Sequence, residues 1–471
     1  MAAIITNKFR IHNAQSFMEG FSEVADTKMY LGIGRPQSWD NDNSPDTPLD
    51  TVAQEYYVWD DMLALKRVNS TDVSMATIRR NWVSGKYYDM YRHDYDGTTT
   101  GVNIDTGSAT TPASLYDSNF FVITDDYNVY KCLNNTLNGA LQPSTYKPTG
   151  TSTSVITQPD GYVWKYMYTV APADVLKFVS TDFIPVKSLG SDPGQNDSYY
   201  TQYLVEDNAS DGSIDWISMD QFGAGYTATP TVEIIGDGVG ATAVATLDGV
   251  TNSITGVVIT NPGSGYTWAR VEIASPGPTG TLAEATAIMA PKGGHGKDSV
   301  EELGGFYVMM NVRLEYDDGA GDFPIDNDYR RISLVRDPTL VGGNTIASAS
   351  TLIANKTIRI DNPTGTFEVD EEIVDSQGAR GTVVSVTAGT PTLIRYYQTR
   401  EVGENVSATD NWMFTANETI TGQSSGATGV VDSIDTADVN HDSGDIIYVE
   451  NRRPINRAGD QIEDIKIIVE M

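Results

Sequence analysis

The first ninety residues have a helical hydrophobic period in two places. An apolar stripe with i, i+3, i+4, i+7 spacing comprises Ala14, Phe17, Met18 and Phe21, and Asn13 precedes it as a suitable N-cap. A second helix is predicted over 52–65, because Val52, Tyr56, Trp59 and Leu63 share a face. Thr51 and Gln54 have the spacing of a capping box before it. Between the two helices, 28–33 predicts a strand that ends at Gly34.

Beyond residue 90 the pattern alternates with period two, which is typical of β-strands. One strand has an aromatic face formed by Tyr162, Trp164, Tyr166 and Tyr168, with Lys165 expected on the opposite, solvent side. Residues 120–124 and 128–133 predict a strand pair. The longest alternation runs from Phe306 to Tyr316.

Two internal repeats interrupt this pattern. In residues 206–297, Gly223-Ala-Gly-Tyr-Thr227 returns as Gly263-Ser-Gly-Tyr-Thr267. In residues 345–440, the spacing of Phe367 and Ile373 returns in Phe414 and Ile420, and each copy then enters a Val-Val strand. Repeats of this length predict small all-β modules in which neither half can bury its apolar face alone.

Charge and cysteine content exclude several classes of function. The 471 residues contain 31 Lys and Arg against 63 Asp and Glu, a net charge of −32. This charge repels phosphate backbones and anionic membrane surfaces. The single cysteine, Cys132, excludes a disulfide framework. No apolar run approaches the ~18 residues of a membrane span, and Lys8 follows the short apolar start instead of preceding it, so no signal peptide is expected.

No catalytic or metal site emerges from the motifs. Gly422-Gln-Ser-Ser-Gly426, followed by Asp435 and His441, has the order of a hydrolase nucleophile elbow. The elbow needs a following helix, whereas Val430 and Val431 predict a strand, so we interpret Ser424 as part of a β-turn. The acidic clusters Asp40/Asp42/Asp46, Asp94/Asp96 and Asp317/Asp318/Asp322 are interpreted as solvated loops. The four histidines lack metal-ligand spacing.

Two arginine pairs are the candidate binding residues of the chain. Arg79 and Arg80 form one pair, and Arg452 and Arg453 form the other. In so acidic a chain, each pair could serve either an interface with a partner or a salt bridge inside the fold. The sequence leaves both alternatives open.

Several stretches resemble the baseplate wedge subunit of contractile-tailed phages, the family numbered gene product eight. The matching blocks, in the same order along the chain, are residues 3–10, 77–82, 129–133, 160–166, 329–334 with Asp337-Pro338, and 444–455. The chain departs from the family pattern where Thr77 and Ile78 precede the first arginine pair, and where Arg453 replaces a proline. The resemblance covers 1–205, 298–340 and 441–471, so the two repeat modules read as insertions.

The resemblance implies a fold, partners and a location. We expect a mainly β fold with a few helices, a β-rich α+β class, in which a middle domain is inserted into the first. The expected divisions are core domain I (1–90, 298–344 and 441–471), core domain II (91–205), and the insertions 206–297 and 345–440. The implied protein is a non-enzymatic homodimer in the tail baseplate of the virion, made and assembled in the host cytoplasm, without cofactors. Its implied partners are the wedge proteins numbered six and seven, with number ten as a further candidate.

A different class of function stays open from the sequence. A receptor-binding or tail-fibre-like protein would use the repeat modules to bind host glycans. The orientation of the modules in an assembled tail would separate the two hypotheses: packed on a neighbour, or pointing outward and unpartnered.

Overall fold

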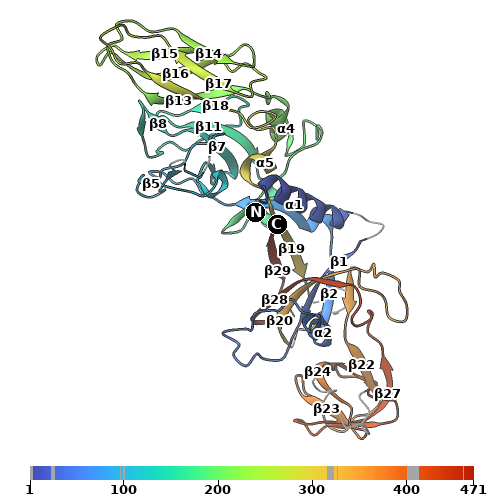
Figure 1. Ribbon diagram of the computed structural model, residues 1–471. Helices are drawn as coiled ribbons and strands as arrows, with labels where there is room; N and C mark the ends of the chain where they lie inside the picture. Colours follow the sequence, from blue (N-terminus) through green and yellow to red (C-terminus); the bar gives the residue numbers. More distant parts are fainter. Residues whose placement is uncertain are drawn as a thin grey trace. The chain divides into compact units, whose positions relative to one another are not determined.

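The computed structural model describes residues 4–22, 27–95, 97–98, 101–315, 323–325, 327–399, 413–459 and 461–471. Within these residues the chain is mainly β with five α-helices, which confirms the predicted fold class (Figure 1). It divides into two compact units. Unit 1 contains 1–15, 74–309 and 468–471, and unit 2 contains 16–73 and 310–467. In the part of the chain covered here, no helix is long and apolar enough to cross a membrane.

Unit 1 contains a four-stranded antiparallel sheet and part of a second four-stranded sheet. The first has the order β10 (Ile156–Thr157), β11 (Val163–Thr169), β7 (Asn128–Asn134), β6 (Phe121–Ile123), and α4 (Tyr200–Asp207) packs on β11. The second has the order β12 (Phe183–Pro185), β3 (Val73–Ile78), β19 (Tyr307–Leu314), β29 (Glu463–Glu470). Residues 310–314 of β19 and 463–467 of β29 belong to unit 2. The remaining elements are α3 (Pro172–Phe178), α5 (Ser299–Leu303) and the short pairs β4 (Gly101–Val102) with β5 (Ala109–Thr110) and β8 (Thr136–Leu137) with β9 (Ala140–Leu141).

The aromatic strand β11 is buried on both faces, which corrects the expected position of Lys165. Trp164 is fully buried and stacks on Tyr162, with ring centroids 5.4 Å apart. Lys165 is also buried; its ammonium donates to the carbonyl of Thr153, and it lies opposite Lys131 of β7. Lys131 in turn pairs with Glu302 in α5. Alternation along one strand cannot show whether a second layer covers its other face, and here one does.

Residues 214–289 form a module with a pseudo-two-fold relation between its repeats. Its strands are β13 (Ile214–Gln221), β14 (Val232–Gly236), β15 (Thr242–Asp248), β16 (Ser253–Asn261), β17 (Ala269–Ile273) and β18 (Glu284–Met289). β14 pairs with its equivalent β17, while β13 pairs with β18 and β16 pairs with β15. The two repeat tyrosines are buried in one shared core. The backbone amide of Ala283 donates to the Tyr226 hydroxyl, and that of Ala241 donates to Tyr266.

Unit 2 contains a five-stranded antiparallel sheet whose strands come from distant parts of the chain. The strand order is β21 (Thr351–Ile353), β2 (Met62–Val68), β1 (Met29–Gly34), β20 (Asp328–Arg336), β28 (Asp445–Asn456). α2 (Val52–Asp60) precedes β2, and the Thr51 hydroxyl accepts a hydrogen bond from the Gln54 amide, as the predicted cap requires. Two of the resembling blocks, 329–334 and 444–455, meet as neighbouring strands in this sheet.

The second repeat folds as a closed barrel of six strands. Their order is β22 (Lys356–Ile360), β25 (Thr392–Tyr397), β24 (Arg380–Thr387), β23 (Glu372–Asp375), β26 (Thr419–Gly422), β27 (Thr428–Asp435). Both repeat phenylalanines, Phe367 and Phe414, are buried in its core. Residues on either side of the barrel do not belong to it: Leu352 and Val439 pack with Trp59 in the core of the five-stranded sheet.

Two local predictions differ from the structure, and a third extends beyond the described residues. The first helix, α1 (Asn7–Ser22), begins six residues before the expected cap Asn13, so it includes part of the 3–10 block. α2 ends at Asp60, because Leu63 and its neighbours pair with β1 in the sheet, and this pairing overrides the helical period. Tyr316, at the end of the predicted strand 306–316, lies outside the described residues.

The buried aromatic face of β11 predicts a strong dependence of stability on Trp164. We expect Trp164→Ala to lower the free energy of unfolding by about 3–5 kcal/mol, because it removes a large buried side chain and leaves a cavity. Leu176→Ala is the control: Leu176 is 82% exposed in the same unit, and its loss should cost less than about 0.5 kcal/mol. Chemical denaturation measures both, and equal losses would contradict the burial of Trp164.

The barrel boundaries predict different outcomes for two deletions. Replacing 356–435 by a short Gly/Ser linker should leave a cooperatively unfolding remainder, because the barrel buries its own core and loop length adds only about 0.6 kcal/mol per doubling. Removing 345–440 should abolish the cooperative melting of unit 2, because it also removes β21 and the core residues Leu352 and Val439. Calorimetry of the two chains tests this, and equal melting would contradict it.

Candidate assembly interface

The pair Arg79–Arg80 follows β3 and is engaged inside unit 1. The Arg80 guanidinium donates to the carbonyl of Tyr116 (2.6 Å) and lies 4.6 Å from the ring centre of Phe121. Burial lowers the pKa of Arg80 to about 10, although Asp117 and Asp89 oppose this shift. Arg79 donates to Asn81 (2.8 Å) and to the carbonyl of Ser180 (2.6 Å). These contacts favour an internal role for this pair.

The pair Arg452–Arg453 lies on β28 and is more open. Arg452 is 3.1 Å from Glu450, its side chain is 40% exposed, and its backbone carbonyl accepts the indole N–H of Trp39 (2.9 Å). Arg453 is exposed. Within the described part of the chain, no ion pair or hydrogen bond of the Arg453 side chain is found. A cation exposed in this way is available to an outside partner.

A third arginine pair, Arg330–Arg331 on β20, was missed as a candidate. The Arg331 guanidinium donates to Asp61 (2.8 Å), to the carbonyl of Tyr57 (2.8 Å) and to Asn451 (3.1 Å), and the side chains of Arg331 and Asp61 are each only 4% exposed. The pair is part of the block 329–334, so the sequence contained the signal. The sequence did not show which acid lies opposite this pair. In the structure that acid is Asp61, which directly follows α2.

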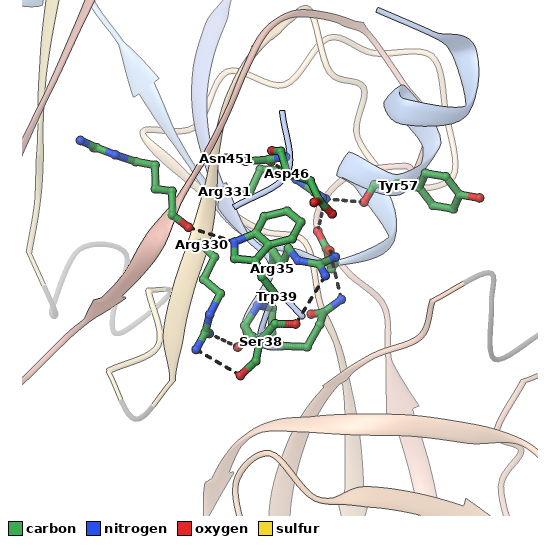
Figure 2. Close-up of polar contacts among 12 residues, drawn as sticks. Arg35, Ser38, Trp39, Asp46, Tyr57, Arg330, Arg331 and Asn451 are labelled. Atoms are coloured by element: carbon green, nitrogen blue, oxygen red, sulfur yellow. Dashed lines mark hydrogen bonds and ion pairs between the residues drawn. The ribbon is translucent and has the colours of Figure 1, made fainter. Parts of the chain in front are cut away.

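Arg330 fastens the loop between β1 and α2. It donates to Asp42 (3.0 and 3.1 Å), to Asp328 (3.2 Å) and to the carbonyl of Pro36. Its hydrogen bonds lower the pKa of Asp42. Asp42 is therefore an arginine ligand and not a freely solvated loop acid. Figure 2 shows Arg330 and Arg331 approaching Ser38, Trp39 and Tyr57 from the strand.

The local backbone explains why the loop reaches this arginine pair. β1 ends at Gly34, where a Cβ would lie 2.9 Å from the carbonyl of Asp61. Arg35 then turns the chain with a positive φ of 54°, and its amide donates to that same carbonyl (3.0 Å). The Arg35 guanidinium stacks on Trp39 (3.7 Å to the ring centre) and lies 3.9 Å from Asp61. Arg35, Trp39, Asp61, Arg330 and Arg331 are called the arginine node below.

All residues of the arginine node except Arg330 line a cavity of about 460 Å³. Tyr57, Leu49 and Asp46 add to the lining, and Leu49 and Tyr57 are exposed. Burial raises the pKa of Asp61 to about 6, even though Arg331 and Arg35 both favour its ionised form. The desolvation of Asp61 therefore outweighs the attraction of its partners, and the node is held by geometry more than by net electrostatic gain.

The side chains of the hydrolase-like motif do not come together. The Ser424 amide donates to the buried carboxylate of Glu371 (3.2 Å), and β27, a strand, follows the turn. Asp435 pairs with Arg359, and His441 contacts the carbonyl of Ala354 (3.3 Å). Asp96, Asp317, Asp318 and Asp322 lie outside the described residues. Elsewhere in the chain, where the structure describes it, no cluster of His, Cys, Asp and Glu could hold a metal ion.

The stability of the arginine node is expected to depend on pH once its central pair is broken. Arg331→Met should cost about 3–5 kcal/mol, because it leaves Asp61 buried without its main counter-charge. Without Arg331 the pKa of Asp61 rises further above about 6. At pH 8 the folded variant must hold Asp61 either ionised without its counter-charge or protonated against the solution pH, and both lower the free energy of unfolding. At pH 5 the carboxyl is protonated and this cost is absent. The loss should therefore be larger at pH 8 than at pH 5.

Arg452→Met is the matched control, because it makes the same change on the neighbouring strand at a 40% exposed side chain. It should cost less than about 0.5 kcal/mol at either pH. Urea denaturation of both variants and of the unaltered chain at the two pH values gives the four losses of free energy of unfolding. A loss for Arg331→Met that is independent of pH would contradict the role of Asp61.

Comparisons with known proteins identify relatives of this chain. The family described as "Bacteriophage T4, Gp8" matches residues 404–471, which include Arg452 and Arg453. Over 258 residues the chain is 26% identical to "Baseplate wedge protein gp8" of Enterobacteria phage T4, covering 48% of this chain and 69% of that protein. The resemblance inferred from the six sequence blocks is therefore confirmed.

Proposed function

We propose that this chain is a structural subunit of a contractile phage tail, docked to neighbouring wedge proteins, because it is similar to the baseplate wedge protein gp8. The similarity to gp8 over about half of the chain carries this proposal. Its location is accordingly the tail baseplate of the virion. The finer parts are that it forms a homodimer, that it binds the wedge proteins numbered six and seven, with ten as a further candidate, and that it acts in host attachment and contraction.

We further propose that the chain has no enzymatic activity and that the two repeat modules are insertions in a family core. The separate partners of Ser424, Asp435 and His441 support the first point. The self-contained cores of the two modules support the second. In this proposal the core comprises 1–90 with 298–344 and 441–471 as one domain, and 91–205 as the other. Residues 74–90 and 298–309 of the first domain lie in unit 1 of the structure.

The docking surface is proposed to include Arg452 and Arg453. Both are on the strand within the region that matches the family, and Arg453 is exposed. A net charge of −32 keeps free subunits apart, so docking needs local patches where this repulsion is reversed or absent. The exposed Arg453, beside the partly exposed Arg452, is such a patch for an acidic partner.

The experiment is charge reversal in the assembled tail. We expect Arg452→Glu with Arg453→Glu to leave the melting temperature nearly unchanged, because neither side chain is buried, and to remove the chain from purified tails. The matched double change at Arg79 and Arg80 should instead lower the melting temperature, because Arg80 is bound inside unit 1. Thermal melting and mass spectrometry of purified tails give both readouts.

Two outcomes separate the parts of this proposal. Normal assembly of the Arg452/Arg453 variant would exclude this pair from the interface and leave the structural role in place. Absence of the unaltered chain from purified tails would contradict the structural role itself.

A further inference from the structure

The pseudo-two-fold relation of the first module allows its two halves to be compared position by position. The amide of Ile214 donates to the carbonyl of Pro262, and that of Ile254 donates to Phe222. The cross-strand pair Val244–Val258 of β15 and β16 corresponds in the same way to the pair Thr286–Ser218 of β18 and β13. Each half therefore serves as the internal reference for the other.

The comparison shows that the β15–β16 side of the module has exposed apolar side chains that the equivalent β13–β18 side lacks. We call these two sides the halves of the module. Val244 and Val258 are 49% and 56% exposed, where the other half has Thr286 and Ser218. Val239 is exposed where the other half has Thr281, and Trp268 where it has Ala228; Leu282 opposite Gly240 is the one reverse case. Equal folding requirements in the two halves cannot explain this asymmetry, because the buried positions match across the two-fold relation.

The exposed side of β15 and β16 also lacks charge. Six residues form it, and we call it the β15–β16 face: Thr242, Val244, Thr246, Gly256, Val258 and Thr260. Between Gly240 and Asn261 only Asp248, near the hairpin turn, is charged. The β14–β17 pair of the same module instead exposes Glu233, Arg270 and Glu272. On a protein of charge −32, a bare Val/Thr face is where an approaching protein meets least repulsion.

We propose that the β15–β16 face packs against an uncharged, apolar surface of a different tail protein once this chain is in place in the baseplate. The proposal rests on the structural role proposed above. Charge argues for this occupant: a basic partner would be drawn to the acidic surface elsewhere, whereas a neutral surface gains from burying Val244 and Val258.

The size of the face argues for a contact made only within an assembly. Six residues on two strands span about 200 Å² at ordinary strand rise and spacing. A stable interface between free proteins needs about 800 Å² per partner. The face therefore cannot hold two free copies together, but it can add a contact when docking elsewhere supplies a high effective concentration.

The test is site-specific crosslinking in purified tails. The photo-crosslinker p-benzoylphenylalanine replaces Val258 in one chain and, as the matched control, Ser218 in another. After irradiation, we expect a covalent adduct between the Val258 variant and a different tail protein, and none from the Ser218 variant. Mass spectrometry identifies the partner.

A smaller substitution at Val258 provides a second test, because the bulky crosslinker could itself prevent the contact. The native Cys132 is buried, so Val258→Cys introduces the reactive thiol. Its maleimide labelling should be at least ten-fold slower in tails than in the free chain, and Ser218→Cys should show no such protection.

Four results would overturn the proposal. These are an adduct with a second copy of this chain, adducts of equal yield from both positions, a lack of both adduct and thiol protection in tails that contain the chain, and protection that requires host cells. The last result would support the receptor-binding alternative. All four leave the structural role intact, which fails only if the unaltered chain is missing from tails.

Discussion

Arg331 and Asp61 form a buried ion pair inside unit 2, with almost no contact with water. The surrounding structure depends on this pair. A buried pair of this kind gains little net stability, because the desolvation of both ions offsets their attraction; the raised pKa of Asp61 shows that desolvation dominates here. Removing either partner is costly, because the remaining charge would be buried alone. The pair therefore acts as a constraint. It fixes β20, the end of α2 and, through Asn451, β28 in one arrangement.

The same constraint links the inner arginines to the outer ones. Trp39 stacks on Arg35, and its indole N–H donates to the backbone carbonyl of Arg452. Arg452 and Arg453 therefore lie on a strand, β28, whose position is constrained by its contact with the arginine node. A rigid base of this kind presents two cations without the entropy cost of ordering a loop on binding.

The two repeat modules bury their apolar faces in two different ways. A short repeat cannot bury its apolar face alone. In the first module the halves exchange strands around a two-fold relation, and in the second they close into a barrel. Once the core is secured by symmetry, the outer faces of the two halves are free to differ. Val244 and Val258 on one side, and Thr286 and Ser218 on the other, show that they do.

The sequence by itself determined the features that depend on local period and repetition. The mainly β class, the cap at Thr51, the strand predicted at 28–33 and both repeats follow from spacing alone, and the six blocks indicated the family that the chain resembles. Only the tertiary structure decided the rest. Leu63 lies in β2 and not in the predicted helix, because β2 pairs with β1. Lys165 is buried because a second layer covers its strand. The buried Arg330 and Arg331 form ion pairs in unit 2 because acids distant in sequence, Asp42 and Asp61, lie opposite them. A side chain's partners across the fold are set by long-range packing, which spacing along the chain cannot encode.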